Sequence, residues 1–189
     1  LISSLGIIKS YHNLLSIIPQ ATDDYIYVIG KTRDEMGGSE FAKIFGYENN
    51  IVPRVDKLNA KINYNNFSKA NQDKLIASAI SIGLGGLSIS LAKMAIASQR
   101  GLKVSFQNIN TINKINNYQV LFSESQSRML VTINPSNKKK FENCFKKNEL
   151  SLIGKIIKSK KIIFKMFGRE EFKVDINSLN KKYRQDLFN

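Results

Sequence analysis

The sequence contains a single cysteine and a single histidine among its 189 residues. Cys144 has no partner for an internal disulfide, and a lone cysteine does not make a cysteine-based metal site. We therefore expect a reducing, cytoplasmic setting. His12 alone cannot supply a histidine-rich metal site, and a Ser-His-Asp triad within this chain is not expected. We predict no metal-ligating residues.

Long hydrophobic runs are scarce. Residues 75–92 carry no charge and reach the usual length of a membrane-spanning helix, about 18 residues. The stretch contains four serines, however, and its glycine cluster at 83–86 would break a helix in the middle. We expect two buried elements joined by a glycine turn, no membrane span and no signal peptide.

Arginine is also scarce, although the net charge is +14. Such a charge is typical of nucleic-acid-binding proteins. Only six of the 29 basic residues are arginine, the residue that reads bases and holds phosphates with two bonds. Lysine, isoleucine and asparagine are abundant together, as a genome biased towards A and T would produce. We favour a solvated lysine surface, and a Lys-rich nucleic-acid-binding module stays a second alternative.

The length suits one domain, and the hydrophobic content of 42% is enough for a core. Neither an internal repeat nor a long linker is visible. In the first half, the pattern predicts strands at 25–30 and 78–82, a polar loop at 31–38, a helix from Ser39 to Phe45, an irregular segment at 49–61, and helices at 68–77 and 87–98.

The second half predicts mostly strands, at 102–109, 118–122, 129–133, 151–157, 161–167 and 171–174, with a loop or short helix at 110–117, a turn near Gly168 and a closing helix at 175–188. Pro135 and Ser136 open a Lys-rich helix. Its spacing places Phe141, Cys144 and Phe145 on one face. We therefore interpret Cys144 as a buried packing residue and not as a nucleophile.

The clearest local signal is Gly37-Gly38-Ser39-Glu40, between a strand and a helix. Glycines allow a close approach of the backbone, and the first N–H groups of a helix are unpaired. Together with the helix dipole, Gly37, Gly38 and Ser39 could hold a phosphate. A tight turn with a serine cap fits the same residues equally well.

Several runs together resemble one family. Residues 30–41 resemble the loop that opens the last domain of the synthetase subunit of phosphoribosylformylglycinamidine synthase, of the aminoimidazole ribonucleotide synthetase superfamily. Pro53-Arg54-Val55-Asp56, the glycine turn Gly85-Gly86-Leu87 with residues 91–95, the run 121–128 and the run 151–155 are similar to further motifs of that domain, in the same order.

This resemblance implies a fold and an activity. The fold is a three-layer α/β domain, with a mixed sheet and helices on its faces, over residues 1–189, of which 1–22 form a lead-in from the preceding domain. The activity is the ATP-dependent amidation of formylglycinamide ribonucleotide in purine biosynthesis. The full-length enzyme would use ATP and magnesium. Its partners would be an N-terminal ATP-binding domain and a glutaminase, and this fragment alone would be inactive.

The resemblance also marks a ligand loop formed by Ser123, Glu124, Ser125, Gln126 and Arg128. Capping, turn formation and a local Glu124–Arg128 ion pair explain the same residues. A selenophosphate synthetase or thiamine-phosphate kinase stays an alternative. Such a relative would share the Gly-Gly-Ser loop but would not be expected to carry this run.

The glycine turn departs from the family pattern. Relatives have a histidine where this chain has Ile80, and aspartates where it has Ser81 and Leu84. Carboxylates there would suit a magnesium–phosphate site. We therefore expect Gly85 and Gly86 to keep a structural turn that has lost its ionic chemistry.

Overall fold

The computed structural model describes residues 3, 5–7, 10–48, 51–169 and 171–185. Its strands are β1 (Tyr25–Ile29), β2 (Ser78–Ile82), β3 (Gly101–Ser105), β4 (Arg128–Ile133), β5 (Leu150–Ile157), β6 (Lys161–Lys165) and β7 (Glu171–Asp175). Its α-helices are α1 (Glu40–Phe45), α2 (Lys57–Gln72), α3 (Gly86–Ser98), α4 (Asn117–Phe122), α5 (Lys138–Glu142) and α6 (Ile176–Gln185). Short 3-10 turns lie at Tyr11–Asn13, Pro135–Asn137, Lys147–Glu149 and Phe167–Arg169.

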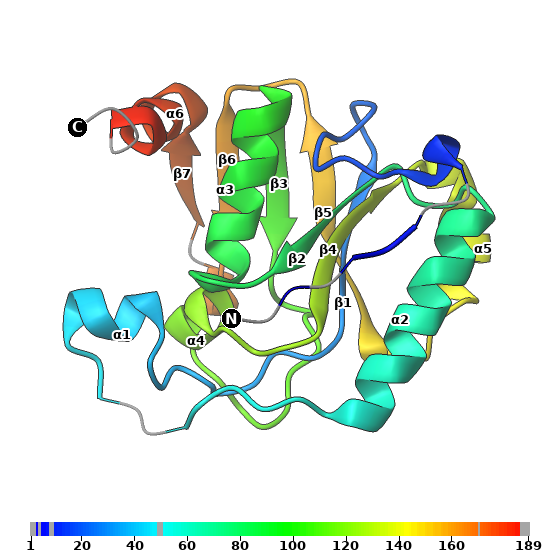
Figure 1. The fold of residues 1–189 in the computed structure, drawn as a ribbon. Coiled ribbons are helices and arrows are strands. Elements are labelled where there is room, and N and C mark those ends of the chain that lie inside the picture. The colour runs from blue at the N-terminus through cyan, green and yellow to red at the C-terminus, as the bar shows by residue number, and fades with distance from the viewer. Residues whose placement is uncertain (1–2, 4, 8–9, 49–50, 170, 186–189) are drawn as a thin grey trace.

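The strands form one seven-stranded mixed sheet in the order β2-β4-β1-β5-β3-β6-β7. Every neighbouring pair is antiparallel except β3 and β6, which are parallel. The ends of β1 and β2 and the start of β4 therefore lie at the same edge of the sheet (Figure 1). The loops predicted to carry chemistry all leave the sheet at this edge.

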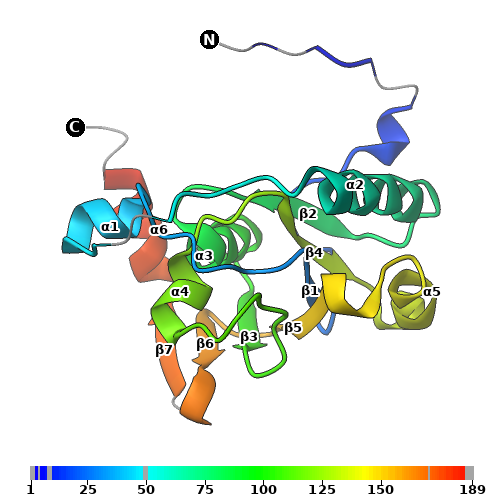
Figure 2. The ribbon, with the colours of Figure 1, turned by 90° about the horizontal axis from the view of Figure 1, so that it is seen from below.

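Both faces of the interior strand β1 are buried. Ile26 and Val28 lie in one core cluster with Leu87, Leu91 and Met94 of α3. The alternate residues Tyr27 and Ile29 lie in a second cluster, which includes Ala70 of α2 and Phe141 of α5. Helices thus pack on both faces of the sheet, with α3, α4 and α6 on one side and α2 and α5 on the other (Figure 2).

Two secondary-structure predictions are wrong. Residues 118–122 were expected to form a strand because they are aromatic and β-branched, but they form α4. Asn116 and Gln119 form a reciprocal capping box, which fixes the start of this helix.

The second error concerns α2. Its start at Lys57 falls inside the segment expected to be irregular, because the Asp56 side chain accepts a hydrogen bond from the Asn59 N–H and caps the helix. The helix ends at Gln72, five residues before the expected end. Lys74 just beyond it has a positive φ of 56°, which breaks the helical path.

The uncharged stretch 75–92 forms β2, the glycine turn and most of α3, and no described helix is long and apolar enough to cross a membrane. Cys144 is half-buried and packs against the cluster that contains Phe141 and Phe145. Burial raises the pKa of its thiol, so little reactive thiolate forms at neutral pH. The closing helix α6 covers 176–185 of the predicted range; residues 186–189 lie outside the described residues.

Candidate functional site

Three segments from distant parts of the chain meet at the sheet edge: the loop after β1, the turn after β2 and the loop before β4. They are joined by hydrogen bonds of Glu124, whose side chain is almost completely buried. Its Oε1 atom accepts from the Gly85 N–H at 2.9 Å and from the Glu40 N–H at 3.0 Å. One carboxylate thus links the N-termini of α3 and α1.

The neighbouring serines bind the loop after β1. The Ser123 hydroxyl donates to the Arg33 carbonyl at 2.7 Å, and the Ser125 hydroxyl accepts from the Arg33 N–H at 3.0 Å. The Glu124 N–H donates to the Glu35 carbonyl at 3.3 Å. These contacts turn Ser123, Glu124 and Ser125 inward, so the predicted ligand loop is largely a scaffold for the loop after β1.

Arg128 is completely buried and does not form the predicted local ion pair with Glu124. Its guanidinium donates to the carbonyls of Ser123 and Ser125 and, at 2.9 Å, to Thr32 Oγ1. Burial lowers its pKa to about 10, and the more distant carboxylates of Glu35 and Glu124 act in the opposite direction. The side chain therefore stays charged at neutral pH and holds its own loop in shape.

Most N–H groups of the predicted phosphate loop already have partners. Gly37 donates to the Ile51 carbonyl at 2.9 Å and Ser39 donates to the Met36 carbonyl at 3.1 Å. The Ser39 hydroxyl caps α1 by accepting from the Ala42 N–H. Of these three backbone N–H groups, only that of Gly38 has no hydrogen bond among the described residues. Phosphate binding by this loop stays a prediction, and one backbone amide remains available for it.

The solvent-facing polar site lies beside this loop, and the sequence did not indicate it. It is a small depression of about 30 Å³ between the loop after β1 and the start of α2. Ion pairs join Lys31 to Glu149 at 2.8 Å and Arg33 to Asp56 at 3.5 Å. Its polar lining consists of Lys31, Arg33, Arg54, Asp56, Asn59, Asn63, Gln126, Ser127 and Glu149.

One buried carboxylate, Glu149, lines this depression, and a second, Glu35, binds the backbone of the lining residue Arg54. Glu149 also accepts from the Asn63 side-chain amide at 2.9 Å. Glu35 accepts from the Arg54 N–H at 3.0 Å through Oε1, and its Oε2 is buried without a hydrogen-bond partner among the described residues. Of the predicted ligand residues, only Gln126 reaches this surface. The sequence signal that could have located the depression is Arg54, the basic residue of the Pro-Arg-Val-Asp run.

The glycine turn has a constrained backbone and no metal ligands. Gly86 has a φ of +68°, and a Cβ atom there would lie 2.8 Å from the Leu121 carbonyl oxygen and 2.7 Å from that of Ser123. Ser81 and Leu84 are exposed at this turn and offer no carboxylate. Within the described ranges, no group of three His, Cys, Asp or Glu side chains could hold a metal ion. These residues do not fit a magnesium site.

The family model described as "AIR synthase related protein, C-terminal domain" matches residues 21–166. The chain belongs to this family. Within this family, the chain is similar to one enzyme over almost its whole length. It is 32% identical over 182 residues to phosphoribosylformylglycinamidine synthase subunit PurL of Thermococcus sibiricus, covering 96% of this chain and 25% of the relative. It is 29% identical over 188 residues to PurL of Lactobacillus helveticus, covering 99% and 24%.

Solved structures support the same family fold. The chain matches "T. maritima PurL complexed with FGAR" with a TM-score of 0.77 and 18% identity, over 90% of this chain and 30% of that one. It matches E. coli HypE, a hydrogenase maturation protein, with a TM-score of 0.62 and 10% identity, over 86% and 52%. The resemblance to phosphoribosylformylglycinamidine synthase and the predicted mixed α/β fold are thus confirmed. The chain spans about a quarter of the length of the PurL relatives.

Proposed function

We propose that this chain works as the C-terminal synthetase-type domain of a phosphoribosylformylglycinamidine synthase. The observation that carries the proposal is the similarity to PurL over almost the entire chain. In this function, an ATP phosphoryl group is transferred to the amide oxygen of formylglycinamide ribonucleotide, and ammonia then displaces the phosphate at the amide carbon. ADP and phosphate are released. Residues 1–22 would form the connection from the preceding domain.

The polar depression supports a role in holding phosphate. Arg54 has an exposed side chain with no ion pair within 4 Å among the described residues, and Lys31 and Arg33 lie in the same lining. Arginine binds phosphate with parallel hydrogen bonds in a charge-assisted contact. We propose that these three cations and the Gly38 N–H, which has no hydrogen bond to a described residue, face a phosphate group of the substrate or of ATP. The depression is too small for a nucleotide, so the rest of the site would come from other domains.

Solved structures of a similar protein support a nucleotide cofactor. PurL of T. maritima has been solved with ATP, with AMPPCP and with ADP. Because Ser81 and Leu84 offer no carboxylate, we propose that residues of another domain hold the magnesium of the full-length enzyme. We keep a cytoplasmic setting as part of this proposal.

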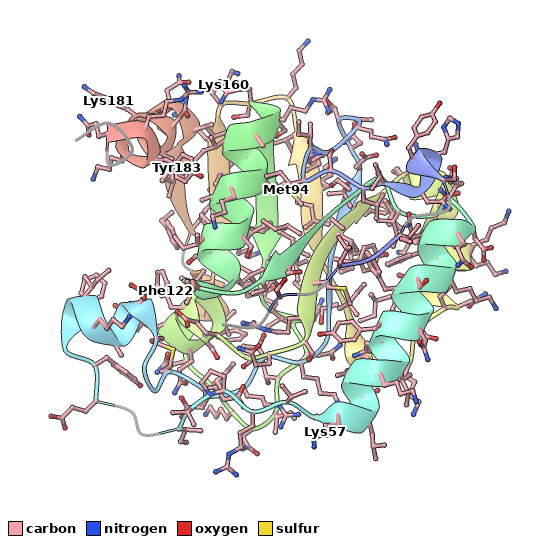
Figure 3. The ribbon with its side chains drawn as sticks, viewed as in Figure 1. Lys57, Met94, Phe122, Lys160, Lys181 and Tyr183 are labelled. Atoms are coloured by element: carbon pink, nitrogen blue, oxygen red, sulfur yellow. The ribbon has the colours of Figure 1, made fainter. Side chains whose placement is uncertain are left out.

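The exposed apolar surface near the site supports contact with a partner domain. Phe41 of α1 contacts Phe45, Tyr47, Tyr118 and Phe122, with ring centroids 4.7–5.8 Å apart. Phe122 lies on the side of α4 that faces α1 (Figure 3). Large apolar side chains remain exposed here, by 71% for Ile44, 68% for Phe45, 59% for Tyr118 and 71% for Leu84. Such patches are typical of protein contacts, and we propose that the N-terminal ATP-binding domain packs on this one.

A glutaminase is the second proposed partner, because the full reaction needs ammonia. "Structure of PurLQS from Thermotoga maritima" matches this chain with a TM-score of 0.76 and 16% identity. Selenophosphate synthetase or thiamine-phosphate kinase chemistry stays the alternative function.

A chimeric enzyme tests the proposed function. This chain would replace the matched quarter of the Lactobacillus helveticus subunit. ADP release would be followed with ammonia, ATP and formylglycinamide ribonucleotide, and the unaltered subunit is the control. We expect substrate-dependent turnover by the chimera and none by the 189-residue chain alone. A chimera that folds and binds ATP but releases ADP only with selenide or a thiamine phosphate would contradict the proposal.

A further inference from the structure

Within the described part of the chain, one half of the sheet has helices on a single face. α3 and α6 pack on β3, β6 and β7 through the first core cluster, while α2 and α5 lie at the other end of the sheet (Figure 2). On the face opposite α3, the outward side chains of β5, β3, β6 and β7 are exposed or half-buried. We call this surface the open sheet face. It consists of Lys155, Ile157, Lys103, Ser105, Lys161, Ile163, Lys165, Glu171, Lys173 and Asp175.

The strand register places four of these side chains in one row. Lys155 lies directly opposite Lys103, Lys103 is paired with Ile163, and Ile163 with Lys173. Side chains that face each other across neighbouring strands point to the same side of a sheet. The centre of the open sheet face is therefore an isoleucine with lysines on both sides of it.

The positive charge of this row is only partly compensated. Lys155 pairs with Asp23 at 2.7 Å and Lys173 with Glu171 at 3.4 Å. Lys103 has no ion pair within 4 Å among the described residues, and the same holds for Lys161 and Lys165. Like charges directly opposite on neighbouring strands are destabilising, and the fold alone gives no reason to place Lys103 against Lys155. An acidic occupant would remove this repulsion.

The chemistry of the face distinguishes between two acidic occupants. Single-stranded nucleic acid usually stacks its bases on exposed aromatic rings. The aromatic residues of these four strands, Phe164 and Phe172, stack on each other on the opposite face, with ring centroids 4.7 Å apart. Glu171 and Asp175 at the two ends of β7 would also repel a phosphate backbone. Carboxylates placed around an aliphatic side chain fit the pattern better.

We propose that the open sheet face binds an acidic protein segment, with carboxylates opposite the lysine row and an aliphatic residue against Ile163. The N-terminal half of β5, with Leu150 and Leu152, also lines a cleft of about 530 Å³, whose other lining residues include Tyr27 and Phe145 and which could take a further apolar side chain. A patch four strands wide and about five residues long covers only about 300 Å². This area is well below that of a stable interface, so the contact is transient and sensitive to salt.

The test uses nitrogen-15-labelled chain and two defined probes. One is a short peptide of glutamates around a single leucine, and the other is an oligothymidylate of the same charge. We expect the peptide to shift amide signals of β5, β3, β6 and β7, and the oligothymidylate to bind more weakly. The double substitution Lys103→Glu and Lys173→Glu should raise the peptide Kd on the order of tenfold. The milder pair Lys103→Gln and Lys173→Gln should give an intermediate Kd.

The control has the same change in net charge at exposed mid-helix positions, Lys61→Glu and Lys93→Glu. It should leave the peptide Kd within about twofold of the original. An equal rise of the peptide Kd in the control would show that the effect depends only on net charge, and it would overturn the proposal. Tighter binding of the oligothymidylate on the same face would replace it with a nucleic-acid surface. An absence of shifts on these strands would also refute it.

Discussion

The Glu124 carboxylate accepts a hydrogen bond from the Gly85 N–H at 2.9 Å, although the two residues are 39 positions apart. The same oxygen accepts from Glu40. Because unpaired N–H groups and the helix dipole favour negative charge at a helix start, one internal carboxylate stabilises two helices at once. It also occupies donors that a ligand phosphate would otherwise use.

Replacing Glu124 tests this bridge. Hydrogen bonds to a charged acceptor contribute about 1.5–3 kcal/mol each. We expect Glu124→Ala to lower the free energy of unfolding by about 3–5 kcal/mol. Glu124→Gln keeps a neutral acceptor and should cost about half as much. Urea denaturation with an unchanged m-value measures both, and an alanine variant as stable as the original chain would refute the bridge.

Arg128 should tolerate no simple replacement. Arg128→Met leaves the carbonyls of Ser123 and Ser125 and the Thr32 hydroxyl without their donor. Each buried neutral acceptor left without its donor costs about 1–3 kcal/mol, so we expect a loss of about 3–5 kcal/mol. Arg128→Lys keeps the charge but cannot reach all three acceptors, so we expect a loss of about 2 kcal/mol. Thermal unfolding followed by circular dichroism should rank the original chain above Lys and Lys above Met.

The buried hydroxyl of Tyr27 should make the folded chain less stable in alkali. Its hydroxyl donates to Glu142 at 2.8 Å, and burial together with this carboxylate raises its pKa far above the ordinary value of 10.0. Above pH 10 the unfolded chain loses this proton while the folded chain keeps it. Stability is therefore complete below pH 10 and falls as the pH rises, by up to about 1.4 kcal/mol per pH unit. Tyr27→Phe should be less stable by about 1 kcal/mol at pH 7 and should lack this component of the decline. Parallel slopes for both proteins between pH 9.5 and 11 would contradict the prediction.

Two glycines with positive φ should respond differently to alanine. At Gly86 a Cβ atom would lie within 3 Å of backbone atoms of Leu121 and Ser123, whereas at Gly38 nothing lies within 4 Å. Gly38→Ala should cost only the backbone strain, about 1–2 kcal/mol. Gly86→Ala adds a clash with atoms that cannot move aside, and we expect a loss of more than about 3 kcal/mol or no folded protein. Equal losses in denaturant midpoint would show that the turn is less constrained than the structure indicates.

The sequence predicted the buried strands well because their signal is local. The runs at 25–30 and 129–133 are apolar on both sides, as expected for strands with helices on both faces. The 118–122 run is also rich in aromatic and aliphatic residues, a content that favours a strand. Its helix depends instead on the capping box of Asn116 and Gln119. Asp56 caps α2 in a similar way, and its place in the Pro-Arg-Val-Asp run does not indicate this role.

The site was predictable only in part. Family motifs identified the three segments that meet at the sheet edge. They could not show that Glu124 binds Gly85 and Glu40, because this contact depends on strand order and register. Nor could they show that Arg54 faces solvent beside Lys31 and Arg33. The orientation of a side chain, inward or outward, is set by the tertiary structure and not by the spacing of residues.

The strand order also determines when the domain can form during synthesis. The interior strand β1 pairs only with β4 and β5, so Tyr25 meets Ile133 and Lys155. At about 5–20 residues per second, the ribosome needs roughly 5–22 s to make the 108 residues from Tyr25 to its first partner, Ile133 of β4. During that time, one of the most apolar segments of the chain has no strand to pair with. Contacts so distant in sequence slow folding, and the nascent chain is then exposed to aggregation and dependent on chaperones.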